Sequence, residues 1–484
     1  MTMQSKYLVI PAALAFGAVY GLSTLFTDSV AETPATRVAA YVPAAQSAPA
    51  YSPDGAFEIR KMMLADIETG EINAAGLRQL EEAVIERAAK DAAAGAKSTE
   101  HFWNEMGPDN IGGRARAICA VTEQVLFSGG VSGGLWKSTD AANHWVQVKS
   151  FPVPMVASIA YVGSGDLYVG TGSQFDNGGG EGGSGFRGRG IWRSTDLGET
   201  WEVVEGTDPG ALGSGDFTAT DALVADPNNP ERADYGGNAG FGYIENGELT
   251  ENAGDGLPSN PVGDIAVAFD GSYMLVALGN GRVYRSNGSD FETFSSVSGS
   301  GDNLLPQSGL SRARVDISPD DPNHAYALYA NSQRLFGGLY HSSDGGFTWE
   351  EIWPDGLDEL TPLPRAQGVY DLALGVVKGN PELAYVGGIE IWRSGPAQQA
   401  EQAAFAFDFP GTNFDVHADV HEIIFTPGGV MYVATDGGLY KSLDAGETYI
   451  ECNREFSVTQ FYGIDHSARS AVIGGTQDNG SLLI

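Results

Sequence analysis

The chain has 484 residues, of which 62 are Asp or Glu and only 27 are Lys or Arg, so its formal net charge is −35. Binding to nucleic acid phosphates or to an anionic membrane surface needs clustered basic side chains, and both are therefore excluded as the main role. Two cysteines, Cys119 and Cys452, are too few for a disulfide framework or a cysteine-rich zinc site. A single bridge between them stays open if the chain is exported.

An apolar segment near the N-terminus predicts export. Lys6 precedes the uncharged run 7–26, and Ser29-Val30-Ala31 fits the small-x-small pattern that signal peptidase recognises. The run has 20 residues, enough to span a bilayer, so cleavage after Ala31 and an uncleaved inner-membrane anchor are both open. In either case the rest of the chain is predicted to be periplasmic or extracellular.

Two short segments separate residues 1–31, the signal peptide or anchor, from the body of the chain. Residues 32–54 are rich in Ala and Pro and poor in large apolar side chains, which predicts a semi-extended tether. In residues 55–98, apolar side chains such as Leu77, Leu80 and Val84 recur at helical spacing. This pattern predicts a helical segment that folds back on the main domain.

A repeated tripeptide organises residues 99–484. An aromatic residue, a basic residue or His, and Ser recur six times, with the serines at positions 138, 194, 286, 342, 394 and 442. The interval between Ser194 and Ser286 is about twice as long as the others, which indicates one degenerate unit without the tripeptide. The hairpin 241–249 stands in the place of the tripeptide in that unit. The average step of about 51 residues is near the length of one four-stranded propeller blade.

An eighth unit begins after Ser442, with strands predicted at 461–466 and 471–475 and a third at the end of the chain. We expect residues 101–106, which contain Trp103, to supply its missing fourth strand, since pairing the two chain ends would remove open sheet edges. The sequence therefore predicts an all-β, eight-bladed propeller, with seven blades as the alternative.

Four units extend the repeat to Ser-x-Asp-x-Gly/Ala-x-Thr/His-aromatic, which resembles the Asp box of the bacterial neuraminidase repeat. Asp can hydrogen-bond the backbone of its own turn, Gly supplies a positive φ, and the aromatic side chain can pack between blades. We therefore predict a structural role for Ser138, Asp140, Trp145, Ser194, Asp196, Trp201, Ser342, Asp344, Trp349, Ser442, Asp444 and Tyr449.

Together with WNEMGPDNIGGRARAI at 103–118, VHADVHEI at 416–423, TQFYGI at 459–464 and GGTQDNG at 474–480, the repeat resembles the sortilin-like, Asp-box propeller proteins that many bacteria export. This family includes sortilin-type receptors, xyloglucanase-type glycosidases, sialidase relatives and photosystem assembly propellers. The resemblance thus implies a fold without implying one function.

The resemblance also implies where a glycosidase would carry its catalytic residues. The sialidase Arg-Ile/Leu-Pro motif is absent, although Arg114 and Arg116 come early in the chain. Xyloglucanase-type propellers have a catalytic Asp in the first blade, where this chain has Gly129-Gly130-Val131-Ser132. We therefore predict a noncatalytic binding or scaffold module, with a glycoside hydrolase as the alternative. Two carboxyl groups about 5–10 Å apart across the channel mouth would favour that alternative.

Two groups of residues are candidate ligand sites at the channel mouth. His417, Asp419 and His421 alternate, so on a strand they would point to one side and could bind a divalent metal or a polar ligand. Alternatively, the histidines hydrogen-bond neighbouring blades and close the channel. In the Gly-rich loop 172–190, Asp176, Arg187 and Arg189 could form a lid or a partner-contacting arm.

The expected partner is a protein or a membrane complex, of which this chain would be a subunit or assembly factor if the N-terminal helix is retained. A glycan is the alternative ligand, and no cofactor other than the divalent metal is predicted.

Overall fold

The computed structural model describes residues 107–483, except 176–186, 210–214, 354–366, 407–414 and 468–470, together with five residues between 79 and 90. All of them belong to a compact unit that spans Pro53–Ile484. The five residues are helical and lie inside the segment predicted to be helical: Gln79, Ala83, Glu86, Arg87 and Lys90. The predicted signal or anchor segment and the tether lie outside the described residues. In the described part of the chain, no helix is long and apolar enough to cross a membrane.

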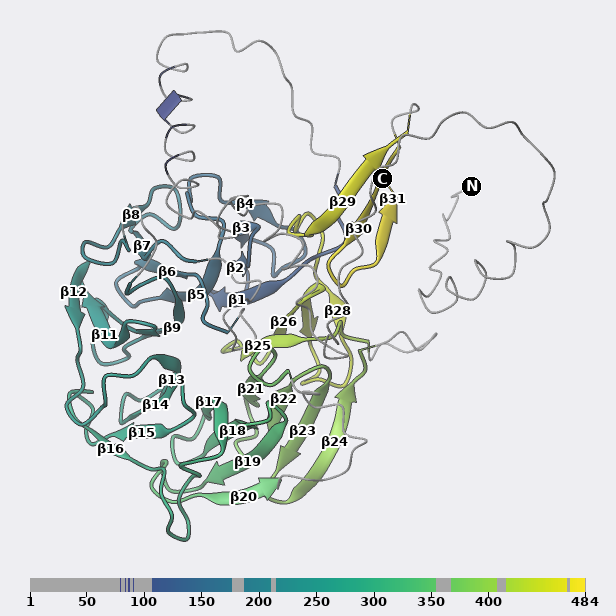
Figure 1. The fold of residues 1–484 in the computed structure, drawn as a ribbon. Coiled ribbons are helices and arrows are strands. Elements are labelled where there is room, and N and C mark those ends of the chain that lie inside the picture. The colour runs from purple at the N-terminus through teal and green to yellow at the C-terminus, as the bar shows by residue number, and fades with distance from the viewer. Residues whose placement is uncertain are drawn as a thin grey trace, which may run out of the picture. The chain divides into compact units, whose positions relative to one another are not determined.

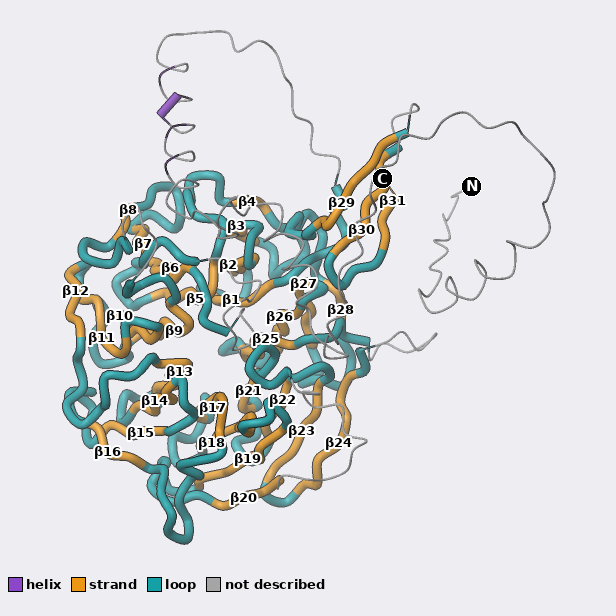
Figure 2. The backbone as a smooth tube through the Cα atoms, in the orientation of Figure 1, coloured by secondary structure: helices purple, strands orange, loops and turns teal. Residues whose placement is uncertain are grey.

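Seven four-stranded antiparallel sheets form the blades of a β-propeller, and the described residues of these blades alternate between strands and loops without helices (Figures 1 and 2). The first three blades follow the chain in order. Blade 1 contains β1 (Ala115–Ala120), β2 (Leu126–Gly130), β3 (Gly134–Ser138) and β4 (Val146–Gln147). Blade 2 contains β5 (Val156–Tyr161), β6 (Leu167–Thr171), β7 (Ile191–Ser194) and β8 (Glu202–Val203). Blade 3 contains β9 (Thr220–Ala225), β10 (Arg232–Gly237), β11 (Gly240–Glu245) and β12 (Glu248–Glu251).

Blades 4 to 7 repeat the same order. Blade 4 contains β13 (Val262–Val267), β14 (Met274–Leu278), β15 (Val283–Ser286) and β16 (Phe294–Ser296). Blade 5 contains β17 (Leu310–Ile317), β18 (Ala325–Asn331), β19 (Phe336–Ser342) and β20 (Glu350–Trp353). Blade 6 contains β21 (Ala373–Val376), β22 (Ala384–Gly387), β23 (Ile391–Gly395) and β24 (Gln398–Ala404). Blade 7 contains β25 (Val420–Phe425), β26 (Met431–Thr435), β27 (Gly438–Ser442) and β28 (Ile450–Glu451).

The first strand of each blade lies nearest the central axis (Figure 1). These inner strands contact one another in succession around the ring. They are buried almost throughout, as in VASIAY of β5 and VGDIAV of β13. Short uninterrupted runs of small and β-branched residues are typical of strands covered on both faces. The degenerate third unit is confirmed as a blade, because the predicted hairpin 241–249 forms most of β11 and β12.

The ring closes between blades 1 and 7, where β1 contacts β25 and β26 directly. Trp136 and Trp145 of blade 1 pack against Phe456, with ring centroids 5.6 and 5.4 Å apart. The Nε1 of Trp145 donates a hydrogen bond to the carbonyl oxygen of Cys452 at 2.9 Å. Closure therefore joins two complete blades through aromatic packing and hydrogen bonds.

Eight sheets are present, as the repeat predicts, but only seven of them form the ring. The eighth consists of β29 (Phe461–His466), β30 (Val472–Thr476) and β31 (Ser481–Leu483), which pair only with one another and extend away from the ring in Figure 1. The prediction of an eight-bladed ring is thus wrong and the seven-bladed alternative holds, because blades 1 and 7 already pack together. Residues 101–106, expected to add a fourth strand, lie outside the described residues.

The Ser-x-Asp segments form turns after the third strand of blades 1, 2, 5 and 7. In blade 5, the Ser342 hydroxyl donates to Asp344 at 2.8 Å, and Asp344 accepts from the Thr348 amide at 2.9 Å. The same contacts recur in the other three turns, Ser138/Asp140, Ser194/Asp196 and Ser442/Asp444. Of the four aromatic residues, Trp145, Trp349 and Tyr449 are buried and Trp201 is partly buried. These hydrogen bonds are those that a turn-forming role requires.

Both cysteines are free thiols. Cys119 packs between blades 1 and 2, whereas Cys452 packs at the junction of blades 1 and 7. The single bridge left open by the sequence is therefore not formed, since the two side chains face different blade junctions.

A pair of histidines in blade 5, of which His341 is buried, predicts a pH-dependent stability. His341 is buried, its Nε2 lies 2.9 Å from Nδ1 of His324, and the Tyr326 ring centroid lies 4.8 Å from its own. Burial, and next the charge of His324, lower the pKa of His341 to about 4. The unfolded chain, with a histidine pKa of about 6.5, takes up the proton first as the pH falls. This contribution to stability is therefore present above about pH 6.5 and is lost as the pH falls toward 4.

Urea unfolding across this pH range measures the effect, and His341→Phe should flatten the dependence of the unfolding free energy on pH. The exposed residue His466 provides the control, since His466→Gln should leave the slope as it is in the parent chain. An equal slope in the parent and in His341→Phe would exclude His341 as the cause.

Candidate functional site

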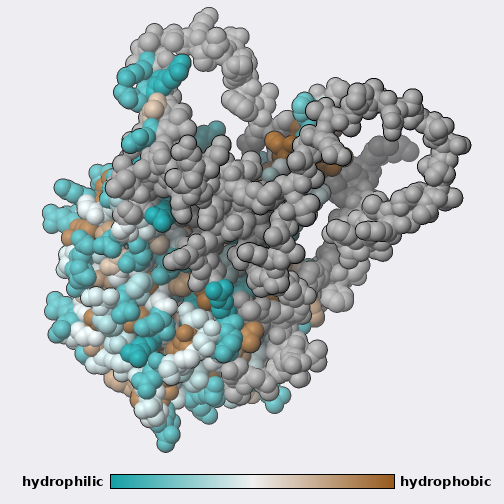
Figure 3. Space-filling view, viewed as in Figure 1, coloured by the Kyte–Doolittle hydropathy of each residue, from teal (hydrophilic) through white to brown (hydrophobic). Residues whose placement is uncertain are grey.

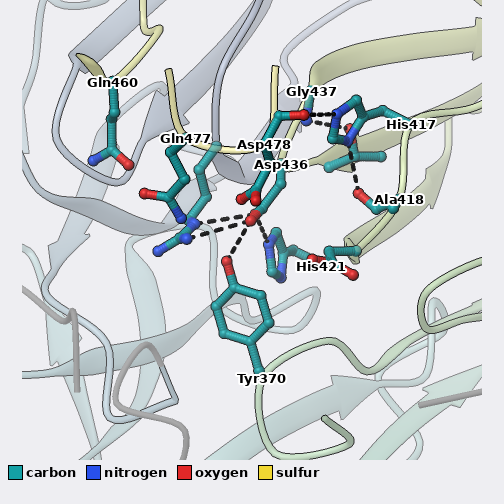
Figure 4. Close-up of polar contacts among 12 residues, drawn as sticks. Tyr370, His417, Ala418, His421, Asp436, Gly437, Gln460, Gln477 and Asp478 are labelled. Atoms are coloured by element: carbon teal, nitrogen blue, oxygen red, sulfur yellow. Dashed lines mark hydrogen bonds and ion pairs between the residues drawn. The ribbon is translucent and has the colours of Figure 1, made fainter. Parts of the chain in front are cut away.

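A group of charged side chains lies at one mouth of the central channel, beside blades 6, 7 and 1 (Figure 4). Arg114 directly precedes β1, and Tyr370 and Asp371 lie just before β21. Asp419 directly precedes β25, and Asp436 occupies the turn between β26 and β27. Strand starts and turns from neighbouring blades meet here because every inner strand enters the channel at the same end.

Asp436 is the centre of this group. Its Oδ1 accepts hydrogen bonds from Arg114 Nε at 3.0 Å and His421 Nε2 at 2.6 Å. Its Oδ2 accepts from Arg114 Nη2 at 3.3 Å and from the Tyr370 hydroxyl at 2.5 Å. Burial alone would raise the pKa of Asp436, but Arg114 and then His421 outweigh it and hold this pKa well below its usual range. Asp436 is therefore an ionised carboxylate at neutral pH, fully engaged by its neighbours.

Two further carboxyl groups approach Asp436. Asp419 and Asp478, the latter from the turn between β30 and β31, each bring an oxygen to within 4.8 Å of the others and of Asp436. Both residues have a left-handed backbone, with φ of 65° and 59°, which Asp adopts more readily than most residues other than Gly. Burial, and next the charge of Asp436, raise the pKa of each to about 7.

Asp371 adds a fourth carboxyl group behind Asp419. This residue is 0% exposed, and its carboxyl group interacts with that of Asp419. Burial, and next the charge of Asp419, raise the pKa of Asp371 well above its usual range. Four carboxyl groups thus gather at the channel mouth, of which Asp371 and Asp436 are buried, Asp419 is partly buried and Asp478 is exposed.

The structure brings two of the three residues of the predicted His-Asp-His set to this group. Asp419 and His421 both approach Asp436, and burial, followed by Arg116, lowers the pKa of His421 to about 4. His417 instead lies against Gly437, with its Nε2 3.2 Å from the carbonyl oxygen of Asp478 (Figure 4). The predicted alternation does not reach His417, because β25 begins only at Val420 and Asp419 has a positive φ.

The second predicted group belongs to blade 2. Arg187 is exposed and Arg189 is partly buried, and both directly precede β7. Asp176 lies outside the described residues. The carboxyl cluster at the channel mouth is built from other segments, so Arg187 and Arg189 are not part of it.

Deeper in the channel, charged side chains from the inner strands pair with one another. Arg314 in β17 reaches Glu422 through Nη2 at 2.7 Å and Asp264 through Nε at 3.3 Å. Arg312 donates to the carbonyl oxygen of Val369 at 2.9 Å, and its guanidinium lies 4.0 Å from the centroid of Phe175. The contacts of Arg314 join blades 4, 5 and 7.

The sequence did not identify three of these residues as site residues: Asp371, Asp436 and Asp478. A signal existed for two of them, because Asp436 and Asp478 occupy the turns between the second and third strands of consecutive sheets. Aligning the units on these turns, TDGG and TQDNG, would have selected both residues. Asp371 carries no comparable signal, since it lies in a loop outside the repeat.

No protein family model and no curated protein matches the chain. Among solved structures, the chain is similar to the GH74 enzyme of Niastella koreensis, with a TM-score of 0.54 and 16% sequence identity. This alignment covers 78% of the chain and 59% of the enzyme, so the chain spans 59% of the enzyme's length. At this identity the likeness shows the propeller fold and nothing of the chemistry.

Two structures of YCF48 are also similar. One is bound to a D1 peptide and has a TM-score of 0.44 with 13% identity, covering 69% of this chain and 93% of its own. The other, from Cyanidioschyzon merolae, has a TM-score of 0.45 with 14% identity, covering 69% of this chain and 96% of its own.

Proposed function

We propose that this protein is an exported, noncatalytic β-propeller of the sortilin-like, Asp-box type that binds a protein partner and acts as a scaffold. The observation that carries the proposal is the β29–β31 sheet, which leaves apolar side chains uncovered. Tyr462, Ile464, Ile473 and Leu483 are 56%, 68%, 52% and 75% exposed, and apolar residues are visible at this sheet in Figure 3. Grouped exposed apolar residues mark interaction surfaces on folded proteins.

Strand register supports a partner that covers the sheet on both sides. Ile473 is paired with Asp465 and Leu483, so these side chains share one face, whereas Ile464 is paired with Gly474 and lies on the other. Every blade of the ring is covered on both faces by its neighbours. A three-stranded sheet needs similar packing to be stable, so we infer a partner with apolar β-sheet surfaces.

The carboxyl geometry at the channel mouth supports a noncatalytic role over the glycoside hydrolase alternative. Glycosidases keep their two carboxyl groups about 5–5.5 Å apart when they retain configuration and about 6.5–9.5 Å apart when they invert it. Here the oxygens of Asp419, Asp436 and Asp478 lie within 4.8 Å of one another. Asp436 is moreover occupied by Arg114, His421 and Tyr370. The carboxylate at the centre of this cluster is therefore engaged in contacts within the protein, which supports the noncatalytic role.

The proposal includes the cellular location expected from the sequence. Export follows from residues 1–31, and retention of 7–26 as an anchor would make the protein a membrane-tethered subunit or assembly factor. The acidic charge of −35 favours a protein partner with basic or apolar character over nucleic acid.

Site-specific photocrosslinking in the native host tests this function. A crosslinking residue at Ile464 should capture one stoichiometric protein, and the same residue at Val146, which is 69% exposed on blade 1, should not. Ile473→Asp should abolish the capture. Equal crosslinking at both positions, or a solitary protein that hydrolyses a glycan, would overturn the proposal, and a glycan product lost in Asp419→Asn would support the hydrolase.

A further inference from the structure

We propose that the face of the β29–β31 sheet that carries Ile473 and Gly475 binds the inner strand of a β-propeller blade, and that the protein partner supplies this blade. The inference rests on the proposed function, because it specifies the kind of surface that the partner brings. The ring shows how such a face is covered, since each of its blades packs against the inner strand of the next.

The β29–β31 sheet is built like the first three strands of a ring blade. The register of β29 shifts between Phe461 and Gly463, and the first strands of blades 1, 2, 4, 5 and 7 shift at the same place. The turn after β30 is held by the Thr476 hydroxyl, which donates to the carbonyl oxygen of Gly480 at 2.8 Å, as Thr435 does in blade 7. The residues of β30 therefore have counterparts in the second strands of the ring.

In four blades, a glycine of the second strand receives the first residue of the next blade's inner strand. A Cβ at Gly387 in blade 6 would lie 2.6 Å from Cγ1 of Val420, and a Cβ at Gly170 in blade 2 would lie 2.7 Å from Cγ2 of Thr220. Only glycine leaves room for so close an approach, and the inserted side chain is β-branched in every case. The same arrangement occurs at two further junctions, Gly129 with Val156 and Gly236 with Val262.

Gly475 is the exposed counterpart of these buried glycines. It pairs with Gly463, the residue after the register shift in β29, just as Gly129 and Gly170 pair with the corresponding residues of β1 and β5. A Cβ at Gly475 would meet no atom of the described residues within 4 Å. The position therefore matches those that the ring fills with valine or threonine, and it is open to a similar side chain from a partner.

Ile473 marks the same face. Two positions before the receiving glycine, the ring blades carry a large side chain that packs against the next blade, such as Phe127, Tyr168 and Tyr385, each 0% exposed. Ile473 holds this position before Gly475 and is 52% exposed. Alternate residues of a strand share a face, so Ile473 and Gly475 lie on one side of the sheet. Both features that a following blade contacts are thus present and uncovered.

A second copy of this chain does not offer the required strand. The inner strands of its seven blades already contact one another around the ring. Its remaining sheet begins with Phe461, which is not β-branched and lies against Gly474 of the same sheet. The charge of −35 on each copy also opposes self-association. The occupant is therefore a blade of the partner, whose inner strand begins with valine, isoleucine or threonine.

A photocrosslinking residue in place of Ile473, in the full chain expressed in its native host, tests the kind of partner. We expect it to capture one protein, and mass spectrometry should locate the crosslink at the first residues of an inner strand in a β-propeller domain. A crosslink to a protein without a propeller, or to a second copy of this chain, would refute the inference.

Gly475→Val and Gly463→Val form a matched pair of variants. A Cβ at either position meets no described atom within 4 Å and neither glycine has a positive φ, so both variants should unfold at the temperature of the parent chain. With the crosslinking residue at Ile464, the yield of captured partner should fall at least tenfold in Gly475→Val, where valine would occupy the space of the inserted side chain. It should stay within twofold of the parent in Gly463→Val, because the ring counterparts of Gly463 include Ser158.

The outcomes separate this inference from the proposed function. Equal yields in the two glycine variants would refute the role of Gly475 while the partner itself stands. No protein captured by the parent chain would overturn the proposed function and this inference together.

Discussion

Replacement of Asp436 by asparagine is expected to lower the free energy of unfolding by about 3–5 kcal/mol, because it leaves the charge of Arg114 buried without its partner. The pair is almost inaccessible to solvent, with exposed fractions of 2% and 1% for the two side chains. Asparagine keeps the size of the side chain, so the loss reports the removed charge rather than a cavity. The amide nitrogen would also face donors on Arg114 and His421, whose hydrogen bonds Asp436 now accepts.

Guanidinium unfolding of the parent chain and of Asp436→Asn measures this change. Asp320→Asn is the control, since Asp320 pairs with Lys378 where the side chains are 30% and 28% exposed. Pairs near the surface contribute at most about 1 kcal/mol. Similar losses in both variants would mean that the pair at the channel mouth is not a principal source of stability.

Truncation of Phe456 to alanine is expected to destabilise the protein by about 3–5 kcal/mol, the usual range for a buried phenylalanine. Phe456 is 0% exposed and lies between Trp136 and Trp145 at the junction that closes the ring. Both tryptophans would lose an aromatic neighbour, and the backbone around Cys452, which accepts a hydrogen bond from Trp145, would lose support. Among the described residues no strand pairs across blades 1 and 7, so packing and hydrogen bonds of side chains hold the ring closed there.

Thermal and chemical unfolding of Phe456→Ala and Phe269→Ala provide the comparison. Phe269 is 52% exposed in blade 4, so its truncation should change the unfolding free energy by less than about 1 kcal/mol. If the two variants were equally stable, ring closure would have to rest on contacts other than those of Phe456.

Much of the fold could be predicted because each blade is encoded locally. The Ser-x-Asp turn is made by contacts between residues two to four positions apart, such as Ser342 with Asp344 and Asp344 with Thr348. A repeat of such turns therefore locates the third and fourth strands in sequence. The strand predicted at 461–466 coincides with β29. The alternation of side chains along a strand and the residues of a turn depend only on positions close together in the sequence.

The candidate site was predicted only in part. Asp419 and His421 were selected from their spacing, but the residue that organises them, Asp436, was not. The approach of Asp478 was also missed, because it depends on where the β30–β31 turn meets the ring. His417 illustrates the limit of a spacing argument, since the positive φ of Asp419 turns the chain before the strand begins.

The sequence by itself determined the all-β repeat, the positions of its blades and the acidic character of the chain, since these depend on residue types and short-range spacing. Only the tertiary structure decided that seven blades close the ring and that four carboxyl groups meet at its mouth. Trp145 and Cys452 are 307 positions apart, and Arg114 and Asp436 are 322 apart. Contacts over such separations arise from the accumulated geometry of all the intervening blades, and no local pattern contains that information.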